Sequence, residues 1–309
     1  MPTIRDGLIT SEEAFGKSGV EFWNTIKEIG WKSTPFLTAI GMGAPRDRSS
    51  NAALGHTWMY DETPDGDLNN AHMEGGAPAA LKYVIGGKLS NHYQIVKDTY
   101  GVSGTEEDGK RVDGSMVLAR AGDLAGIRHK QTIEKILLSD QAALARVNTG
   151  ASKAAGKCGG LKSFATVTNT IDAKNATLSM QTLRDVLKVG HKKSRPYDFI
   201  LVNDKQLDKI MDLIDKIKQV NNTVEYLHDK VQAIDSQYGE SVKILLSPEL
   251  ADTELIAFRS DDIYKVDWRN TRRRELPSEN DEIKREILTE FTLRVCTPVA
   301  FAWVKNLAA

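Results

Sequence analysis

The stretch RVDGSMVLARAGDLAGIRHKQTIEKILLSDQAALAR, residues 111–146, decides the fold class because its apolar residues recur at three- and four-residue spacing. That spacing is typical of a helix with one buried face. About thirty residues of helix would form a rod of about 45 Å, longer than an average helix. Two shorter helices with a break near Gly122 or Gly126 are the alternative interpretation.

Strand patterns lie on both sides of this helix. Apolar runs at Phe199–Val202, 242–246 and Leu255–Phe258 predict buried strands, with helical spacing between them. The strongest strand signal closes the chain, where apolar residues alternate on either side of Pro298. The alternating residues are Phe291, Leu293 and Val295, then Val299, Phe301 and Trp303. The sequence therefore predicts an α+β protein.

A long two-stranded excursion precedes the helix, from about residue 56 to residue 103. Trp58 and Tyr60 lie on one side of its first strand, and the chain returns through Tyr83 and Ile85. The tip between them is polar and rich in glycine, so it has little core of its own. Because such a hairpin is marginally stable alone, it needs a partner surface. We therefore name Trp58, Tyr60, Tyr83 and Ile85 as candidate intersubunit contacts.

The first 50 residues have the pattern of an arm, with breaks at Pro35 and Pro45. Residues 12–31 could form one short amphipathic helix. An ordinary helix packed on its own domain is an equally good interpretation of the same pattern.

Composition excludes several classes of protein. The chain is 40% hydrophobic and 27% charged, with a formal net charge of -1, so it lacks the basic surface of a protein that wraps nucleic acid. Cys158 and Cys296 are too few for a disulfide framework and fit a reducing compartment. No apolar run reaches the length of a transmembrane helix, and the start of the chain lacks a signal core. We expect a protein made in a cytoplasm, with no membrane partner.

The search for chemistry identifies no catalytic residue, cofactor site or metal site. Residues 151–158, ASKAAGKC, resemble a phosphate-binding loop, but Ala151 replaces the first glycine and Cys158 replaces the hydroxyl residue. A glycine-rich turn is the better interpretation. The six histidines lack the spacing of a metal site.

Two basic clusters, residues 191–195 and Arg269 with residues 272–274, could contact phosphate. Both lie beside acidic residues, so solvated faces or ion pairs with neighbouring subunits are the favoured interpretation.

Six short segments appear in a telling order: STPFLTAIG (33–41), TWMYDE (57–62), EGGA (74–77), LSNHYQIVK (89–97), VSGT (102–105) and LRVCTPVA (293–300). In this order they resemble the SU10-like family of tailed-phage major capsid proteins, which have the HK97 fold. The likeness runs through nearly the whole chain, although each segment alone is only moderately specific.

The resemblance implies a division of the chain. Residues 1–53 would be an N-terminal arm and residues 54–102 the extended E-loop. Residues 103–180 and 276–309 would form the P-domain, with a spine helix at 111–146. Residues 181–275 would form the A-domain.

The resemblance also implies a structural function without catalysis. Subunits would form hexamers and pentamers, and these would form the icosahedral head of a virion that encloses double-stranded DNA without sequence preference. Assembly would occur in the host cytoplasm with a portal and a possible decoration protein. The start at Met1, without a long helical prefix, suggests a separate scaffolding protein. Lys82 and Lys88 lie where some relatives form crosslinks, but no acceptor residue can be matched.

Two other functions stay open at this point. A nanocompartment shell of the same fold would enclose an enzyme cargo in place of DNA. A nucleotide-dependent hydrolase that uses Lys157 is a distant third possibility.

Overall fold

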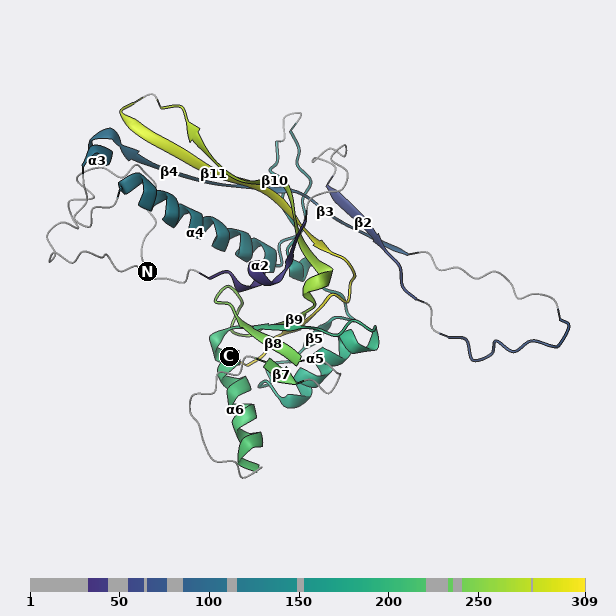
Figure 1. The fold of residues 1–309 in the computed structure, drawn as a ribbon. Coiled ribbons are helices and arrows are strands. Elements are labelled where there is room, and N and C mark those ends of the chain that lie inside the picture. Colours follow the sequence, from purple (N-terminus) through teal and green to yellow (C-terminus); the bar gives the residue numbers. More distant parts are fainter. Residues whose placement is uncertain are drawn as a thin grey trace.

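The computed structural model describes residues 33–43, 55–63, 66–76, 86–109, 116–148, 153–220, 233–235, 241–278 and 280–308. Figure 1 shows an elongated part, in which one long helix lies along a sheet, and a compact part beneath it. A thin hairpin projects away from both parts (Figure 1). The mixture of helices and strands confirms the predicted α+β class.

The sheet of the elongated part has the strand order β1-β10-β11-β4. Its long members are β10 (Ile263–Leu276) and β11 (Glu282–Val295), which pair antiparallel, and β4 (Gln94–Ser103) lies antiparallel on the other side of β11. Strand β1 (Gly41–Gly43) adds a parallel edge to β10. Because β11 is central, residues 286–293 are buried on both faces of the sheet.

The long helix α4 (Val117–Leu138) lies against β4 and β11 and buries Ile133 and Leu137. It is continuous, so the alternative with a break at Gly122 or Gly126 is wrong. A residue outside the helix caps its first turn: the backbone N–H of Leu118 donates to the Glu107 carboxylate at 2.9 Å.

The predicted continuation of this helix to residue 146 is also wrong. The backbone N–H and the hydroxyl of Ser139 both donate to the Ile136 carbonyl, which closes the last turn. The chain then runs into two antiparallel bridges, Leu144 with Lys157 and residue 147 with residue 154. The apolar residues at 142–145 have the spacing of a helix. In the structure, backbone pairing across the turn takes the place of helical hydrogen bonds and satisfies the N–H and C=O groups.

The compact part contains a six-stranded sheet in the order β5-β12-β9-β6-β8-β7. Helices α5 (Met180–Lys192) and α6 (Asp204–Val220) belong to this part. The strands are β5 (Thr170–Asp172), β6 (Phe199–Val202), β7 (Ala233–Asp235), β8 (Ser241–Leu246), β9 (Leu255–Phe258) and β12 (Phe301–Lys305). The strands predicted at Phe199–Val202 and Leu255–Phe258 are therefore confirmed.

Two strands belong to a different sheet from the one implied by the domain boundaries that the sequence predicts. Strand β10, expected within 181–275, pairs with β11 in the elongated part, and β12, expected with 276–309, lies between β5 and β9 in the compact part. The reason is pairing between distant segments: β12 contacts β9 in antiparallel register and β5 in parallel register. Local alternation does not reveal which sheet a strand joins.

The short helix α2 (Pro35–Ala39) links the two parts. Its Phe36 ring packs edge-on against Phe258 of β9, with centroids 5.2 Å apart. The buried carboxylate of Glu134, on α4, accepts hydrogen bonds from the Leu37 N–H at 3.4 Å and from the Ser247 hydroxyl at 3.0 Å. The helix proposed for residues 12–31 lies outside the described residues. Within the described part of the chain, no helix is long and apolar enough to cross a membrane.

Candidate assembly surface

The projecting hairpin pairs β2 (His56–Tyr60) with β3 (Gly87–Asn91) in antiparallel register. Its root is fixed to the elongated part. Trp58 is 5% exposed, and its indole N–H donates to the Val295 carbonyl at 2.7 Å. Its ring also lies near Phe164, with centroids 6.1 Å apart.

Asn91, at the same root, satisfies its whole amide side chain inside the protein. Its NH₂ group donates to the carbonyls of Gly159 and Leu293 at 3.0 and 2.8 Å. Its oxygen accepts from the N–H groups of Gly159 and His92 at 2.7 and 2.8 Å. Because one side chain joins β3, β11 and the 159 turn, the direction in which the hairpin leaves the body is set at this point.

The outer half of the hairpin is quite different. Every described residue between 61 and 76 is exposed. Leu68 and Met73 in this region are 99% and 87% exposed, and Met59, on β2, is 70% exposed. These exposed apolar side chains make the outer part of the hairpin a candidate interaction surface.

The four residues predicted as intersubunit contacts have different positions. Trp58 is buried against its own chain, so it offers little surface to a neighbour. Tyr60 is half-buried and its ring lies over Gly87, where an added Cβ would meet the ring at 2.3 Å. Tyr83 and Ile85 lie outside the described residues. The prediction favoured aromatic residues and did not include the exposed Met59, Leu68 and Met73, although a Leu and a Met in a polar, glycine-rich tip were a visible signal.

The phosphate-loop resemblance does not fit the geometry of its described residues. The N–H groups of Ala154 and Lys157 donate to the carbonyls of Val147 and Leu144 at 3.0 and 2.9 Å, so they are not directed at a ligand. Cys158 is fully buried, and burial raises the pKa of its thiol to about 11. In the described residues, no three His, Cys, Asp or Glu side chains come together as a metal site.

The two basic clusters take part in ion pairs within the chain. In the first, Lys193 pairs with Glu62, and Arg195 reaches Asp262 at 2.9 Å. The sequence favoured solvated faces or ion pairs with neighbouring subunits, whereas the partners found at these positions lie within the same chain.

The arginine cluster on β10 behaves in the same way. Arg269 contacts the buried Glu290 of β11 at 2.6 Å, and Arg146 contacts the other oxygen of that carboxylate at the same distance. Arg274 contacts Glu286 at 3.1 Å. These pairs hold β10, β11 and the 144–157 turn together.

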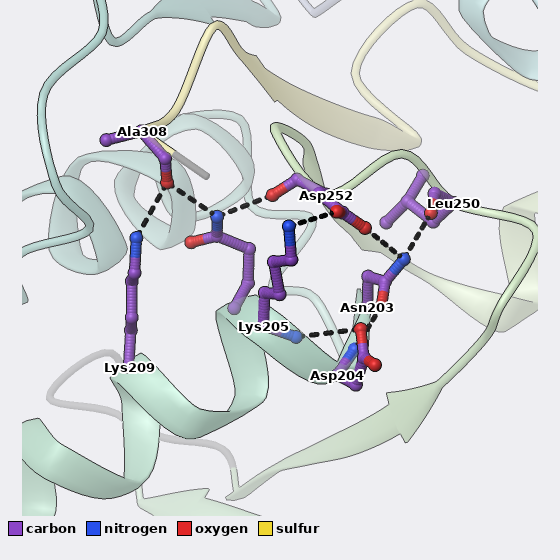
Figure 2. Close-up of polar contacts among 8 residues, drawn as sticks. Asn203, Asp204, Lys205, Lys209, Leu250, Asp252 and Ala308 are labelled. Carbon is purple, nitrogen blue, oxygen red and sulfur yellow. Dashed lines mark hydrogen bonds and ion pairs between the residues drawn. The ribbon is translucent and has the colours of Figure 1, made fainter.

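A polar network closes the compact part at the start of α6 (Figure 2). Asn203 donates to the Leu250 carbonyl and to the Asp252 carboxylate, both at 2.8 Å. Buried Gln206 donates to the carbonyls of Asp252 and Ala308 at 2.6 and 3.0 Å. The network therefore fastens the last described turn of the chain to the first turn of α6.

A family model described as SU10 major capsid protein matches residues 9–308. The chain belongs to the SU10 major capsid protein family. This membership makes it a structural component of a capsid, and places the mature protein in the virion. None of the curated proteins matches this capsid protein.

Solved structures of capsids have the same fold as this SU10 capsid protein. One, "Cyanophage A-1(L) capsid asymmetric unit", has a TM-score of 0.68 at 11% identity, covering 93% of this chain and 96% of the other. "The capsid of Myoviridae Phage XM1" gives 0.61 at 12% identity, with 98% and 100% covered. A holo-SrpI encapsulin complex from Synechococcus elongatus PCC 7942 gives 0.61 at 11% identity, with 99% and 96% covered. The HK97 fold expected for this SU10 capsid protein is thereby confirmed.

Proposed function

We propose that this protein forms hexamers and pentamers that close into an icosahedral head around double-stranded DNA, with the β2–β3 hairpin as the element that joins neighbouring subunits. In this proposal the hairpin and its loop are the E-loop. The elongated part serves as the P-domain and α4 as its spine helix, while the compact part serves as the A-domain.

The observation that carries the proposal is the contrast between the two ends of the hairpin. Its root is anchored through Trp58 and Asn91, whereas Met59, Leu68 and Met73 are exposed on an element that projects from the body. Leaving three large apolar side chains in water is unfavourable by about 1.5–3 kcal/mol each relative to burying them. Contact with a second copy of the chain would remove that cost.

In this proposal the partners beyond the shell are a portal, a scaffolding protein and a possible decoration protein. DNA would be enclosed and not specifically bound, because basic and acidic residues nearly balance. Both cysteines are free thiols, which fits assembly in a reducing host cytoplasm.

Deleting residues 65–77 and closing the gap with a short Gly-Ser turn tests the role of the hairpin. We expect the melting temperature of the subunit to change little, because every described residue of the deleted segment is exposed. Closed shells should be lost or strongly reduced in sedimentation. A deleted subunit that is unfolded would place the segment in the domain core, and normal shell yield would show that the hairpin does not join subunits.

The enclosed content separates a phage head from a nanocompartment. We expect particles matured in an infection to contain DNA that resists added nuclease and is released when the shell is opened. Particles that contain only an enzyme cargo would favour the nanocompartment function over the phage head.

A further inference from the structure

The carboxyl group of Glu134 lies where the elongated part, the compact part and the short helix α2 meet. Glu134 belongs to α4 and is 1% exposed. One of its oxygens accepts from the Ser247 hydroxyl, at the end of β8, at 3.0 Å, and the other accepts from the Leu37 N–H of α2 at 3.4 Å. A single ionisable group therefore joins three separate segments of the chain.

Helix α2 takes its N-terminal cap from this carboxyl. The first N–H groups of a helix have no partner within it, and a capping side chain usually supplies one. Thr34, at the N-cap position, makes no such bond, and Pro35 has no N–H. The next two N–H groups, those of Phe36 and Leu37, interact with Glu134 instead. Glu134 thus supplies from α4 the cap that α2 itself lacks.

Helix α2 also packs between the two parts of the molecule (Figure 1). Phe36 is fully buried with its ring edge-on against Phe258 of β9, and Phe258 stacks on Phe199 of β6 with centroids 5.5 Å apart. After α2 the chain continues into β1, which pairs with β10 in the elongated part. Displacing α2 would therefore release a contact between the two parts and would open the Glu134 carboxyl to water.

Few charged groups surround this carboxyl. Helix α2 contains no charged residue. The turn after β8 contributes Glu249, whose negative charge opposes ionisation of Glu134 and which pairs with Lys135 at 3.8 Å. Lys130, one turn earlier on α4, is exposed, and His129 is directed at the sheet. Among the described residues, only neutral donors contact the Glu134 carboxyl.

Docking of α2 is linked to protonation of this group. An ionised carboxyl that is buried among neutral donors has lost its water, so burial raises the pKa of Glu134 above 4.5 while α2 is docked. A carboxyl opened to water by displacement of α2 regains its ordinary pKa. The docked state then binds the proton more tightly than the displaced state, so protonation stabilises docking and ionisation weakens it. The Ser247 hydroxyl can donate or accept, so the neutral carboxyl keeps this contact.

We infer that Glu134 is a proton-sensitive clasp: its neutral carboxyl holds α2 between the two parts, and its ionisation loosens α2 from that position. The clasp regulates how firmly residues 33–43 are fastened to the body, and with them how firmly the two parts are joined. Because it acts within one subunit, it does not depend on the proposed self-assembly.

Hydrogen exchange of the unassembled full-length subunit tests the clasp. Exchange is followed by mass spectrometry from about pH 5 to about pH 8, corrected for the intrinsic pH dependence of amide exchange. We expect the protection of residues 33–43 to fall several-fold as pH rises, while the strand Phe199–Val202 keeps its protection. Glu134→Gln, which is neutral at every pH, should show constant protection in 33–43. A flat wild-type profile, or equal loss of protection in both segments, would overturn the inference.

Two neighbouring substitutions keep the test decisive even where Glu134→Gln does not fold. Glu249→Gln removes a charge that opposes ionisation, so the loss of protection should level off at a lower pH. Ser247→Ala removes a hydrogen bond that favours the charged form, so the loss should level off at a higher pH. As a matched control, Asp123→Asn alters a 76% exposed carboxylate of α4 and should leave the profile unchanged. Shifts of the same sign in Glu249→Gln and Ser247→Ala would contradict the clasp.

Discussion

The indole nitrogen of Trp58 and the carbonyl oxygen of Val295 lie 2.7 Å apart, which joins two residues separated by 237 positions in the chain. This contact fastens the first strand of the projecting hairpin to the last residue of β11. The hairpin therefore has a rigid root and an exposed end, which is the arrangement an assembling subunit needs. Mutations at the root should act on subunit stability, and mutations at the end should act on assembly.

Trp58→Phe is expected to destabilise the subunit by about 1–3 kcal/mol, because it keeps most of the ring but leaves the Val295 carbonyl without its donor. Trp58→Ala should cost about 3–5 kcal/mol, since it also removes the buried ring. Equilibrium urea unfolding of the purified subunit measures both. Met59→Ala, one position along and 70% exposed, is the matched control and should leave the midpoint unchanged. A Trp58→Ala variant as stable as the wild type would contradict the anchoring role.

Glu134 should make stability depend on pH. Burial raises the pKa of its carboxyl above the ordinary value of 4.5, because the charged form loses water. The folded state then binds the proton more tightly than the unfolded state, so the contribution of this group to stability is present below pH 4.5 and is lost as pH rises through the folded pKa.

Glu134→Gln removes that dependence. We expect the wild type to lose stability relative to Glu134→Gln as pH rises from 4.5 to 7, by chemical denaturation at each pH. The Ser247→Ala variant removes the hydroxyl that donates to Glu134 and leaves the carboxyl in place, so it is the control for loss of that hydrogen bond. A difference between wild type and Glu134→Gln that stays constant with pH would show that the carboxyl does not titrate with unfolding.

Two glycines near α4 should respond in opposite ways to alanine. Gly126→Ala should stabilise the subunit by about 0.5–1 kcal/mol, because the new Cβ stands in the helix interior and its nearest contact, the Arg273 guanidinium, is 3.4 Å away. Gly160→Ala should be strongly destabilising, because its Cβ would lie 2.2 Å from the Ser139 carbonyl oxygen. Thermal unfolding of the two variants checks the opposite signs, and a common sign would show that the packing at one of these glycines differs from that described.

The network at the start of α6 offers a matched pair of substitutions. Gln206→Ala should cost about 1–3 kcal/mol, since it removes a fully buried side chain together with its hydrogen bonds to the carbonyls of Asp252 and Ala308. Lys205→Ala removes an ion pair with Asp252 at the surface and should leave the free energy of unfolding nearly unchanged. Urea unfolding that ranked the two variants in reverse would contradict the account of this network.

The sequence by itself determined the fold class and several elements. Phe199–Val202 and Leu255–Phe258 were predicted as strands because continuous apolar runs of this short length are typical of buried strands. The order of six short segments indicated the capsid family, although each segment alone is only moderately specific. The rejection of the phosphate loop likewise needed only the residue types at two positions.

Only the tertiary structure decided where those elements belong. The alternation near the C-terminus predicts strands, but pairing places β11 in one sheet and β12 in the other. The same apolar period that predicts α4 continues past Leu138, yet backbone bridges to residues 154 and 157 end the helix. Trp58 has the sequence pattern of an exposed contact residue. In the structure its indole N–H donates to the carbonyl oxygen of Val295. In each case the deciding partner is distant in sequence, and local periodicity carries no information about partners that the folded chain brings together.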